Sequence, residues 1–427
     1  MVKIPVFEVE QWMDTYETTP GVLNIAETCA CSISITELLA LRTGNKDKDK
    51  DKDSSGSTAA AASAIFDFST PLTYGAIRGS DALRQNIAAL YAEDGSEDED
   101  KDSSSRTGTV TPDDVIVTQG AIAANHLVFY TLVGPGDHVV CVFPTYQQLY
   151  AVPETLGAEV SLWRLRAEDG YVPDVGELEK LIRSNTKMIV LNNPNNPTGA
   201  TTPRAVLEQI IAVARRHDIT VLSDEVYRPL FHGLPASETP PPPPSALSLG
   251  YDKVVVTSSM SKAWALAGIR VGWAASRDAS IVARLALARD YTTISVSQLD
   301  DQVARFALSP DVRPALLARN TALARTNLAL LDAFVRDRPR VCSWVRPAAG
   351  TTAFVRFCHA SDGRPVDDEA FCLDVLAETK VMFLPGARCF GHGRGFEGYV
   401  RIGYVGDTDV LRRALELLGE YVAANLN

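Results

Sequence analysis

The sequence lacks any run of about 18 apolar residues, so it predicts no membrane-spanning helix. Its first residues mix acids with apolar side chains and contain no signal-peptide core. The seven cysteines show no CxxC pair and no Cys/His spacing typical of zinc, and their odd number argues against a disulfide framework. A net charge of −12 disfavours nucleic acid and anionic membranes as partners. We therefore expect a cytoplasmic protein without a metal site.

Three polar stretches interrupt a composition that is otherwise globular, with 46% hydrophobic and 22% charged residues. Residues 45–63 are rich in Lys, Asp, Ser and Ala, residues 95–109 are polar, and residues 233–247 contain five consecutive prolines. The segment 93–102 alone contributes −6 of the net charge. We expect solvated insertions at all three places, and the proline run excludes both helix and central strand there.

The remaining pattern alternates short β-branched runs with amphipathic helices, which indicates a three-layer α/β fold with a mostly parallel sheet. From about residue 305 it changes to long helices and isolated strands, typical of an α+β segment. The predicted strands of the sheet are 114–118, 138–143, 159–165, 188–192, 219–222, 253–257 and 270–275. The 427 residues predict two domains. We expect an N-terminal arm that joins the small domain (1–44), a linker (45–63), a large domain (64–304) and a small C-terminal domain (305–427).

The segment 257–274, TSSMSKAWALAGIRVGWA, contains the clearest set of candidate catalytic and ligand-binding residues. Lys262 follows a predicted strand, and Ser259, Ser261 and Arg270 place phosphate-binding groups close to its amine. A lysine amine can form a Schiff base with an aldehyde cofactor when its pKa is lowered. The pattern S-x-S-K-x-x-x-x-x-G-x-R-x-G resembles the fold-type-I pyridoxal-phosphate enzymes of the class I/II aminotransferase family.

This resemblance implies an aspartate-aminotransferase-like fold and pyridoxal 5'-phosphate as cofactor. It makes Lys262 the lysine of the internal aldimine, and it makes Ser259, Ser261 and Arg270 phosphate ligands. At 118–125, TQGAIAAN matches the family's phosphate turn, whose backbone N–H groups open a helix. The cofactor-binding positions of that turn are Gly120, Ala121 and Ile122.

Further motifs follow in the family's order. The resemblance implies that Tyr146 in FPTY stacks on the cofactor ring and that Asn196 in NNPNNPTG lies beside the cofactor 3-oxygen and the substrate carboxylate. In VLSDEVY, Asp224 matches the carboxylate that keeps the pyridine nitrogen protonated, and Tyr227 matches the hydrogen-bond donor to the 3-oxygen. Arg401 in GYVRI matches the arginine that grips the substrate α-carboxylate.

Tyr74 matches a tyrosine that reaches the phosphate of the neighbouring subunit in relatives, so the resemblance implies a homodimer with shared active sites. Near the N-terminus, LNIAETCACSISITELLAL departs from the usual transaminase pattern and is similar to 1-aminocyclopropane-1-carboxylate synthases and capreomycidine synthases. That similarity would place Glu27 near the substrate. It leaves the roles of Cys29 and Cys31 open, and an arm that packs on the dimer explains the segment equally well.

The shared chemistry makes the freed Lys262 the base that removes the substrate α-proton. The leading hypothesis is transfer of the amino group from an amino acid to a 2-oxo acid. The alternative is a lyase or cyclase that eliminates, replaces or closes a ring, since the fold does not decide the fate of the carbanion. A non-catalytic pyridoxal-phosphate-binding regulator is disfavoured because every catalytic position is filled.

Overall fold

The computed structural model describes residues 3–42, 62–92, 109–234, 241–392 and 395–426. The predicted insertions at 45–63 and 95–109 lie almost entirely outside these ranges, and so does part of 233–247. The prolines at 241–244 form neither helix nor strand, as predicted. Within the described ranges, no helix combines the length and the apolar character that crossing a bilayer requires.

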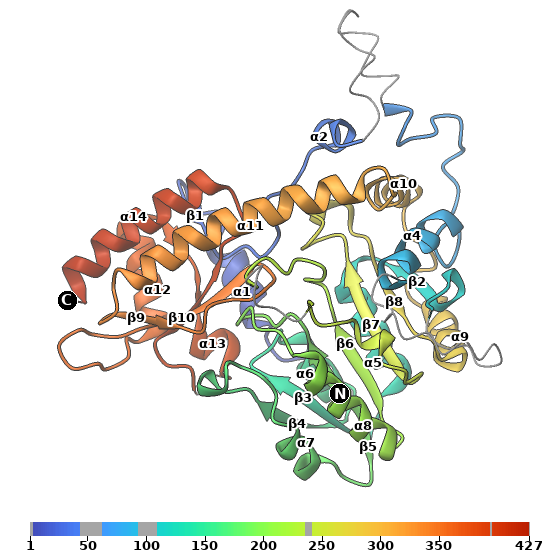
Figure 1. The fold of residues 1–427 in the computed structure, drawn as a ribbon, viewed down its shortest axis with the longest axis horizontal. Coiled ribbons are helices and arrows are strands. Elements are labelled where there is room, and N and C mark those ends of the chain that lie inside the picture. The colour runs from blue at the N-terminus through green and yellow to red at the C-terminus, as the bar shows by residue number, and fades with distance from the viewer. Residues whose placement is uncertain (1–2, 43–61, 93–108, 235–240, 393–394, 427) are drawn as a thin grey trace, which may run out of the picture.

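A seven-stranded sheet forms the centre of the large domain (Figure 1), in the order β2-β8-β7-β6-β5-β3-β4. Its strands are β2 (Val115–Thr118), β3 (His138–Phe143), β4 (Glu159–Arg164), β5 (Thr186–Asn192), β6 (Thr220–Asp224), β7 (Val254–Ser259) and β8 (Gly272–Ala275). β8 runs antiparallel to both of its neighbours, and the other pairs are parallel. The predicted mostly parallel sheet is therefore confirmed.

Both faces of this sheet are buried, which explains why its strands read as nearly continuous apolar runs. Alternate strand residues enter two separate cores: Ile189 and Val221 enter one, and Val190 and Leu222 enter the other. The second core is closed by helices α5 (Gly120–Leu132), α6 (Gln148–Thr155) and α9 (Ala279–Arg289). The first core is closed by α4 (Asp81–Ala92), α7 (Val175–Leu181), α8 (Arg204–Arg216) and α10 (Gln298–Ala307). Short 3-10 turns lie at Pro112–Asp114, Ala167–Asp169, Ala246–Ser248 and Ala267–Ile269.

The C-terminal part forms a second, antiparallel sheet in the order β12-β13-β10-β9. Its strands are β9 (Cys342–Trp344), β10 (Thr352–Phe357), β12 (Leu384–Pro385) and β13 (Tyr399–Gly403). Helices α11 (Arg313–Arg336) and α14 (Thr408–Asn425) lie side by side along it, drawn in orange and red in Figure 1. The remaining elements there are α12 (Asp368–Thr379), β11 (Val381–Met382) and α13 (Gly386–Phe390).

The N-terminal segment packs into this C-terminal part. Strand β1 (Leu23–Asn24) pairs in parallel with β11, and helix α1 (Glu8–Tyr16) contacts α13. Helix α2 (Ile35–Ala40) starts with a capping box formed by Ser34 and Glu37. Both chain ends therefore build the smaller α+β part, as the fold prediction requires. The exact domain boundaries stay predictions.

Candidate active site

A cavity of about 590 Å³ opens where β6 and β7 end, between the large sheet and the N-terminal segment. This is the edge at which open parallel sheets bind ligands. Residues far apart in the sequence meet here. The predicted site residues that line it are Glu27, Ala121, Ile122, Tyr146, Asn196, Asp224, Tyr227, Ser259, Ser261, Lys262, Arg270 and Arg401.

Asp224 ends β6 and is 3% exposed. The Asn125 amide donates a hydrogen bond to its carboxylate over 2.9 Å, and the Val226 backbone N–H donates another over 3.1 Å. Burial raises the pKa of Asp224 to about 6, although these hydrogen bonds and the Lys262 charge oppose the shift. Among the described residues, Asp224 forms no salt bridge. The carboxylate is thus placed to pair with a cation that a ligand supplies.

Asn125 is a site residue that sequence reasoning missed. It lies on α5, and its side-chain oxygen accepts a hydrogen bond from the Thr257 hydroxyl over 2.5 Å. Its amide also donates to Gln148 over 3.2 Å, which fixes the orientation of the amide toward Asp224. The only sequence signal was a polar residue inside an otherwise apolar stretch of helix, and the bond to Asp224 spans 99 positions.

The start of α5 forms an anion cradle. No side chain caps this helix, so its first N–H groups are free to bind a ligand. Gly120 has φ +80°, and a Cβ there would lie 2.6 Å from Arg270 Nη2. A Cβ on Gly272 would lie 2.4 Å from the Gly120 carbonyl carbon. The two glycines therefore let β8 and Arg270 approach the first turn closely.

Arg270 is held over this turn by hydrogen bonds to Ser261 Oγ (3.3 Å) and to the Ala267 carbonyl (3.0 Å). Ser259 Oγ accepts a hydrogen bond from the Ser261 N–H over 3.2 Å. No carboxylate of the described chain pairs with Arg270. Helix N–H groups, hydroxyls and a guanidinium without an acidic partner make a phosphate-binding set.

Lys262 faces the N-terminal segment across the cavity. Its Nζ lies 2.5 Å from Thr28 Oγ1, 3.5 Å from Cys29 Sγ and 3.8 Å from Glu27 Oε1. Thr28 is a second contact that the sequence did not reveal. Burial raises the pKa of the Cys29 thiol to about 11, with the Lys262 charge opposing, so this thiol stays protonated near neutral pH.

Glu27 behaves as the counter-charge of Lys262. Burial opposes its ionisation, but the Lys262 ammonium and hydrogen bonds from Cys29 and Thr28 outweigh burial and lower the pKa of Glu27 to about 2. Its side chain is still 52% exposed, so solvent screens the pair. The backbone at Glu27 packs directly against β13, because a Cβ on Gly403 would lie 1.8 Å from the Glu27 carbonyl oxygen.

Arg401 on β13 is 3% exposed. Its Nη2 donates to the Ala26 carbonyl over 2.8 Å, and its Nη1 lies 3.3 Å from Asn196 Oδ1. Its Nε has no hydrogen-bond partner in the described part of the protein. A buried donor without a partner is costly, which indicates that a ligand completes this site. The Tyr146 hydroxyl lies 3.4 Å from Glu10 Oε1, so α1 also borders the cavity.

Tyr74 is not brought to this cavity. It is 79% exposed and lies in a separate surface hollow beside Pro71, Gly75 and Val296.

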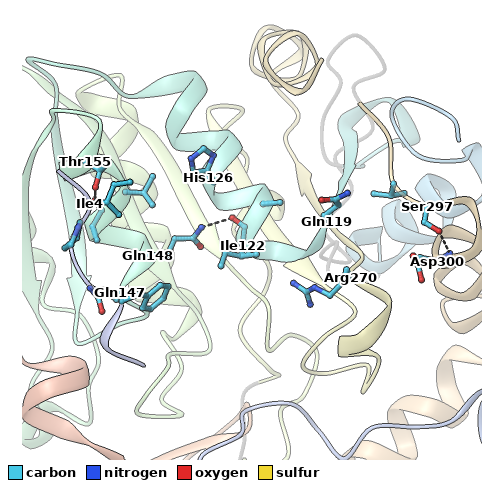
Figure 2. Close-up of a pocket in the computed structure, with 16 residues that line it drawn as sticks. Ile4, Gln119, Ile122, His126, Gln147, Gln148, Thr155, Arg270, Ser297 and Asp300 are labelled. Carbon is cyan, nitrogen blue, oxygen red and sulfur yellow. Dashed lines mark hydrogen bonds between the residues drawn. The ribbon is translucent and has the colours of Figure 1, made fainter. Parts of the chain in front are cut away.

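A larger hollow of about 810 Å³, mostly apolar, runs along α5 (Figure 2). The figure shows its lining extending from Ile4 and Thr155 at one end to Ser297 and Asp300 at the other, with His126 and Arg270 between them. The two cavities share Ile122 and Arg270.

Comparison with known proteins identifies the family. The family model described as Aminotransferase class I and II matches residues 36–418. Capreomycidine synthase from Streptomyces vinaceus is 32% identical over 72% of this chain and 74% of that protein. Arginine–pyruvate transaminase from Pseudomonas aeruginosa is 31% identical over 81% and 84%. A PLP-dependent aminotransferase from Streptococcus suis has a structure similar over 100% of this chain and 99% of that chain, with TM-score 0.82 and 36% identity.

The chain belongs to the class I and II aminotransferase family. Its cofactor is pyridoxal phosphate, as in the PLP-dependent neighbour. The cavity fits this group: it offers a buried carboxylate for the ring nitrogen, a cradle for the phosphate and the Lys262 amine between them. Within the described residues no cluster of His, Cys, Asp and Glu could hold a metal ion.

The raised pKa of Asp224 predicts a pH effect on the cofactor-free protein. The native state holds this proton up to about pH 6, whereas the unfolded chain releases it near pH 3.8. The free energy of unfolding should therefore fall as pH rises through this window, by on the order of 2–3 kcal/mol. Asp224→Asn should remove this loss. Urea denaturation at pH 4 to 7 measures the free energy of unfolding, and Asp374→Asn on α12 is the control that should keep the wild-type pH dependence. The same pH dependence in wild type and Asp224→Asn would contradict the assignment.

Proposed function

We propose that this protein is an aminotransferase that transfers the amino group of an amino acid to a 2-oxo acid. The observation that carries the proposal is the convergence of three groups on one cavity: the Lys262 amine, the buried Asp224 carboxylate and the Arg401 guanidinium. Similarity to an arginine–pyruvate transaminase over 81% of the chain supports the pairing of an amino acid with a 2-oxo acid.

Each side chain has a distinct task in this proposal. Pyridoxal phosphate, when bound, supplies a carbonyl that reacts with amines and a ring that withdraws electrons from the substrate α-carbon. Asp224 accepts the ring N–H, and Tyr227 and Asn196 donate hydrogen bonds to the 3-oxygen. Tyr146 stacks on the ring. The phosphate lies among Gly120, Ala121, Ile122, Ser259, Ser261 and Arg270.

Lys262 would hold the cofactor through its amine, and its Nζ would take the α-proton of the substrate. The substrate α-carboxylate would bind Arg401, whose Nε has no partner among the described residues and is a free donor. Thr28 Oγ1, 2.5 Å from Nζ, positions the amine once the cofactor is displaced from it. Glu27, 3.8 Å from Nζ, stabilises the protonated amine that results.

Replacing Lys262 tests the core of the proposal. Lys262→Ala should lose covalent cofactor, seen as loss of the visible absorbance band, and should lower turnover by about 10⁴-fold because the proposed base is removed. Lys253→Ala is the matched control, since Lys253 lies on the same stretch of chain but pairs with Asp218 at the surface. Turnover by Lys262→Ala close to wild type would refute the assignment.

Ring closure is the second candidate function. It is supported by 32% identity to a capreomycidine synthase and by the segment Glu27–Cys29, which lines the cavity beside Lys262. The two candidates differ in products. Amino transfer yields one 2-oxo acid per active site when an amino acid is added alone, and further turnover requires a second 2-oxo acid.

A product analysis separates the two. With amino acid alone, we expect a stoichiometric burst of 2-oxo acid that stops near one equivalent per subunit, followed by formation of a new amino acid when pyruvate is added. Mass spectrometry of the supernatant measures both. Continuous release of ammonia or of a cyclic amino acid without any 2-oxo acid acceptor would replace the leading function with the second.

We also infer a homodimer with shared sites. The segment around Tyr74 exposes further large apolar side chains, Phe68 (73%), Leu72 (74%) and Ile77 (55%). Exposed apolar side chains clustered in one short segment favour burial against another protein, and we propose that a second copy brings Tyr74 to the anion cradle beside Arg270. All seven cysteines are free thiols, which supports a reducing compartment such as the cytoplasm.

Mixed dimers test the sharing of sites. Lys262→Ala and Tyr74→Ala should each be strongly impaired, the second mainly at limiting cofactor. Chains refolded together should regain up to about a quarter of wild-type activity, because each heterodimer contains one site with neither substitution. Steady-state assays with size-exclusion chromatography measure this. Activity equal to the average of the two parent proteins would show that each site is built from one chain.

A further inference from the structure

One face of helix α1 presents carboxylates to the active-site cavity. Glu10, Met13, Asp14 and Glu17 line the cavity, and their spacing of three and four residues places them on one side of the helix. Glu17 directly follows the last helical residue. This face closes the cavity on the side of the N-terminal segment, near the Tyr146 hydroxyl that lies 3.4 Å from Glu10.

In the described part of the chain, Asp14 and Glu17 have no cationic partner, whereas Glu10 lies within electrostatic reach of Arg401. Within the described parts of the chain, neither Glu10, Asp14 nor Glu17 forms a salt bridge. By contrast, Glu8 on the same helix pairs with Arg388 at 2.8 Å, away from the cavity. Like charges three or four residues apart on a helix repel each other. The last turn has no basic residue, so Glu17 also adds to the negative end of the helix dipole.

The cations of the cavity are used elsewhere. Lys262 and Arg270 serve the cofactor, and Lys262 already has Glu27 at 3.8 Å. Arg401, 3% exposed, lines the same cavity and carries the unpartnered Nε, which independently indicates a ligand with an anionic group at that point. The part of that ligand away from Arg401 would face the carboxylates of α1, Glu10, Asp14 and Glu17.

We infer that the substrate is an amino acid whose side chain ends in a cation, a guanidinium or an ammonium group. This inference rests on the proposed function, because it requires an amino acid in the cavity with its carboxylate on Arg401. The side chain then extends toward α1, where Asp14 and Glu17 bind its positive end. A cation there relieves the repulsion within α1 and favours the carbonyl end of the helix.

A pair of ligands that differ only in charge tests this. Arginine and citrulline have nearly the same shape, and their 2-methyl forms lack the α-proton, so neither can go on to proton removal and amino transfer. Calorimetric titration of the holoenzyme should show 2-methylarginine binding at least about tenfold more tightly than 2-methylcitrulline, about 1.4 kcal/mol. The ratio should shrink as salt is added. Equal affinity for the two would overturn the inference.

Variants locate the charge effect. In Asp14→Asn/Glu17→Gln the ratio should fall to within about twofold while 2-methylcitrulline binds as before. Glu420→Gln, an exposed carboxylate on α14, should keep the wild-type ratio. An unchanged ratio in the double variant would also overturn the inference. The two failures can be told apart. Cyclic products together with a preserved ratio of 2-methylarginine to 2-methylcitrulline affinity would refute only the proposed function. 2-Oxo acid products together with an affinity ratio of one would refute only this inference.

Discussion

The buried carboxylate of Asp224 is the constraint on which the rest of the site depends. An ionised carboxylate removed from water is costly unless it is paired and hydrogen-bonded. The protein supplies the hydrogen bonds through Asn125 and Val226, but its described residues supply no ion pair. The raised pKa of Asp224 expresses this imbalance. A protonated ring nitrogen would resolve it, so we propose that the arrangement that destabilises the protein alone would hold the cofactor in its electron-withdrawing form.

The sheet provides the rigidity that this arrangement needs. Asp224 ends a central strand that is hydrogen-bonded on both sides, to β5 and to β7. Thr257, on β7, orients Asn125, so two neighbouring strands and α5 share one polar network inside an apolar core. Networks of this kind fix a single geometry when every member is satisfied. The anion cradle lies at the start of the same helix, at Gly120, five residues before Asn125.

Much of this could be predicted from the sequence, because short motifs report local backbone structure. The strand at 138–143 has the predicted limits, and the family, fold and cofactor are confirmed. The predicted site residues line one cavity except Gly120, which lies beside Arg270 at the start of α5, and Tyr74. The partner-subunit role of Tyr74, like the other roles, stays a prediction. Asn125, Thr28 and the acidic face of α1 were missed. Their contacts join segments separated by up to 234 positions, and only tertiary packing decides which helix face meets the cavity.

The most direct test is the protonation state of the cofactor ring nitrogen opposite Asp224. We expect the holoenzyme reconstituted with ¹⁵N-labelled pyridoxal phosphate to show a nitrogen chemical shift typical of a protonated ring through pH 8. Asp224→Ala should show the shift of an unprotonated ring. An unprotonated ring in the wild-type enzyme, or the same shift in both proteins, would contradict the central role assigned to this carboxylate.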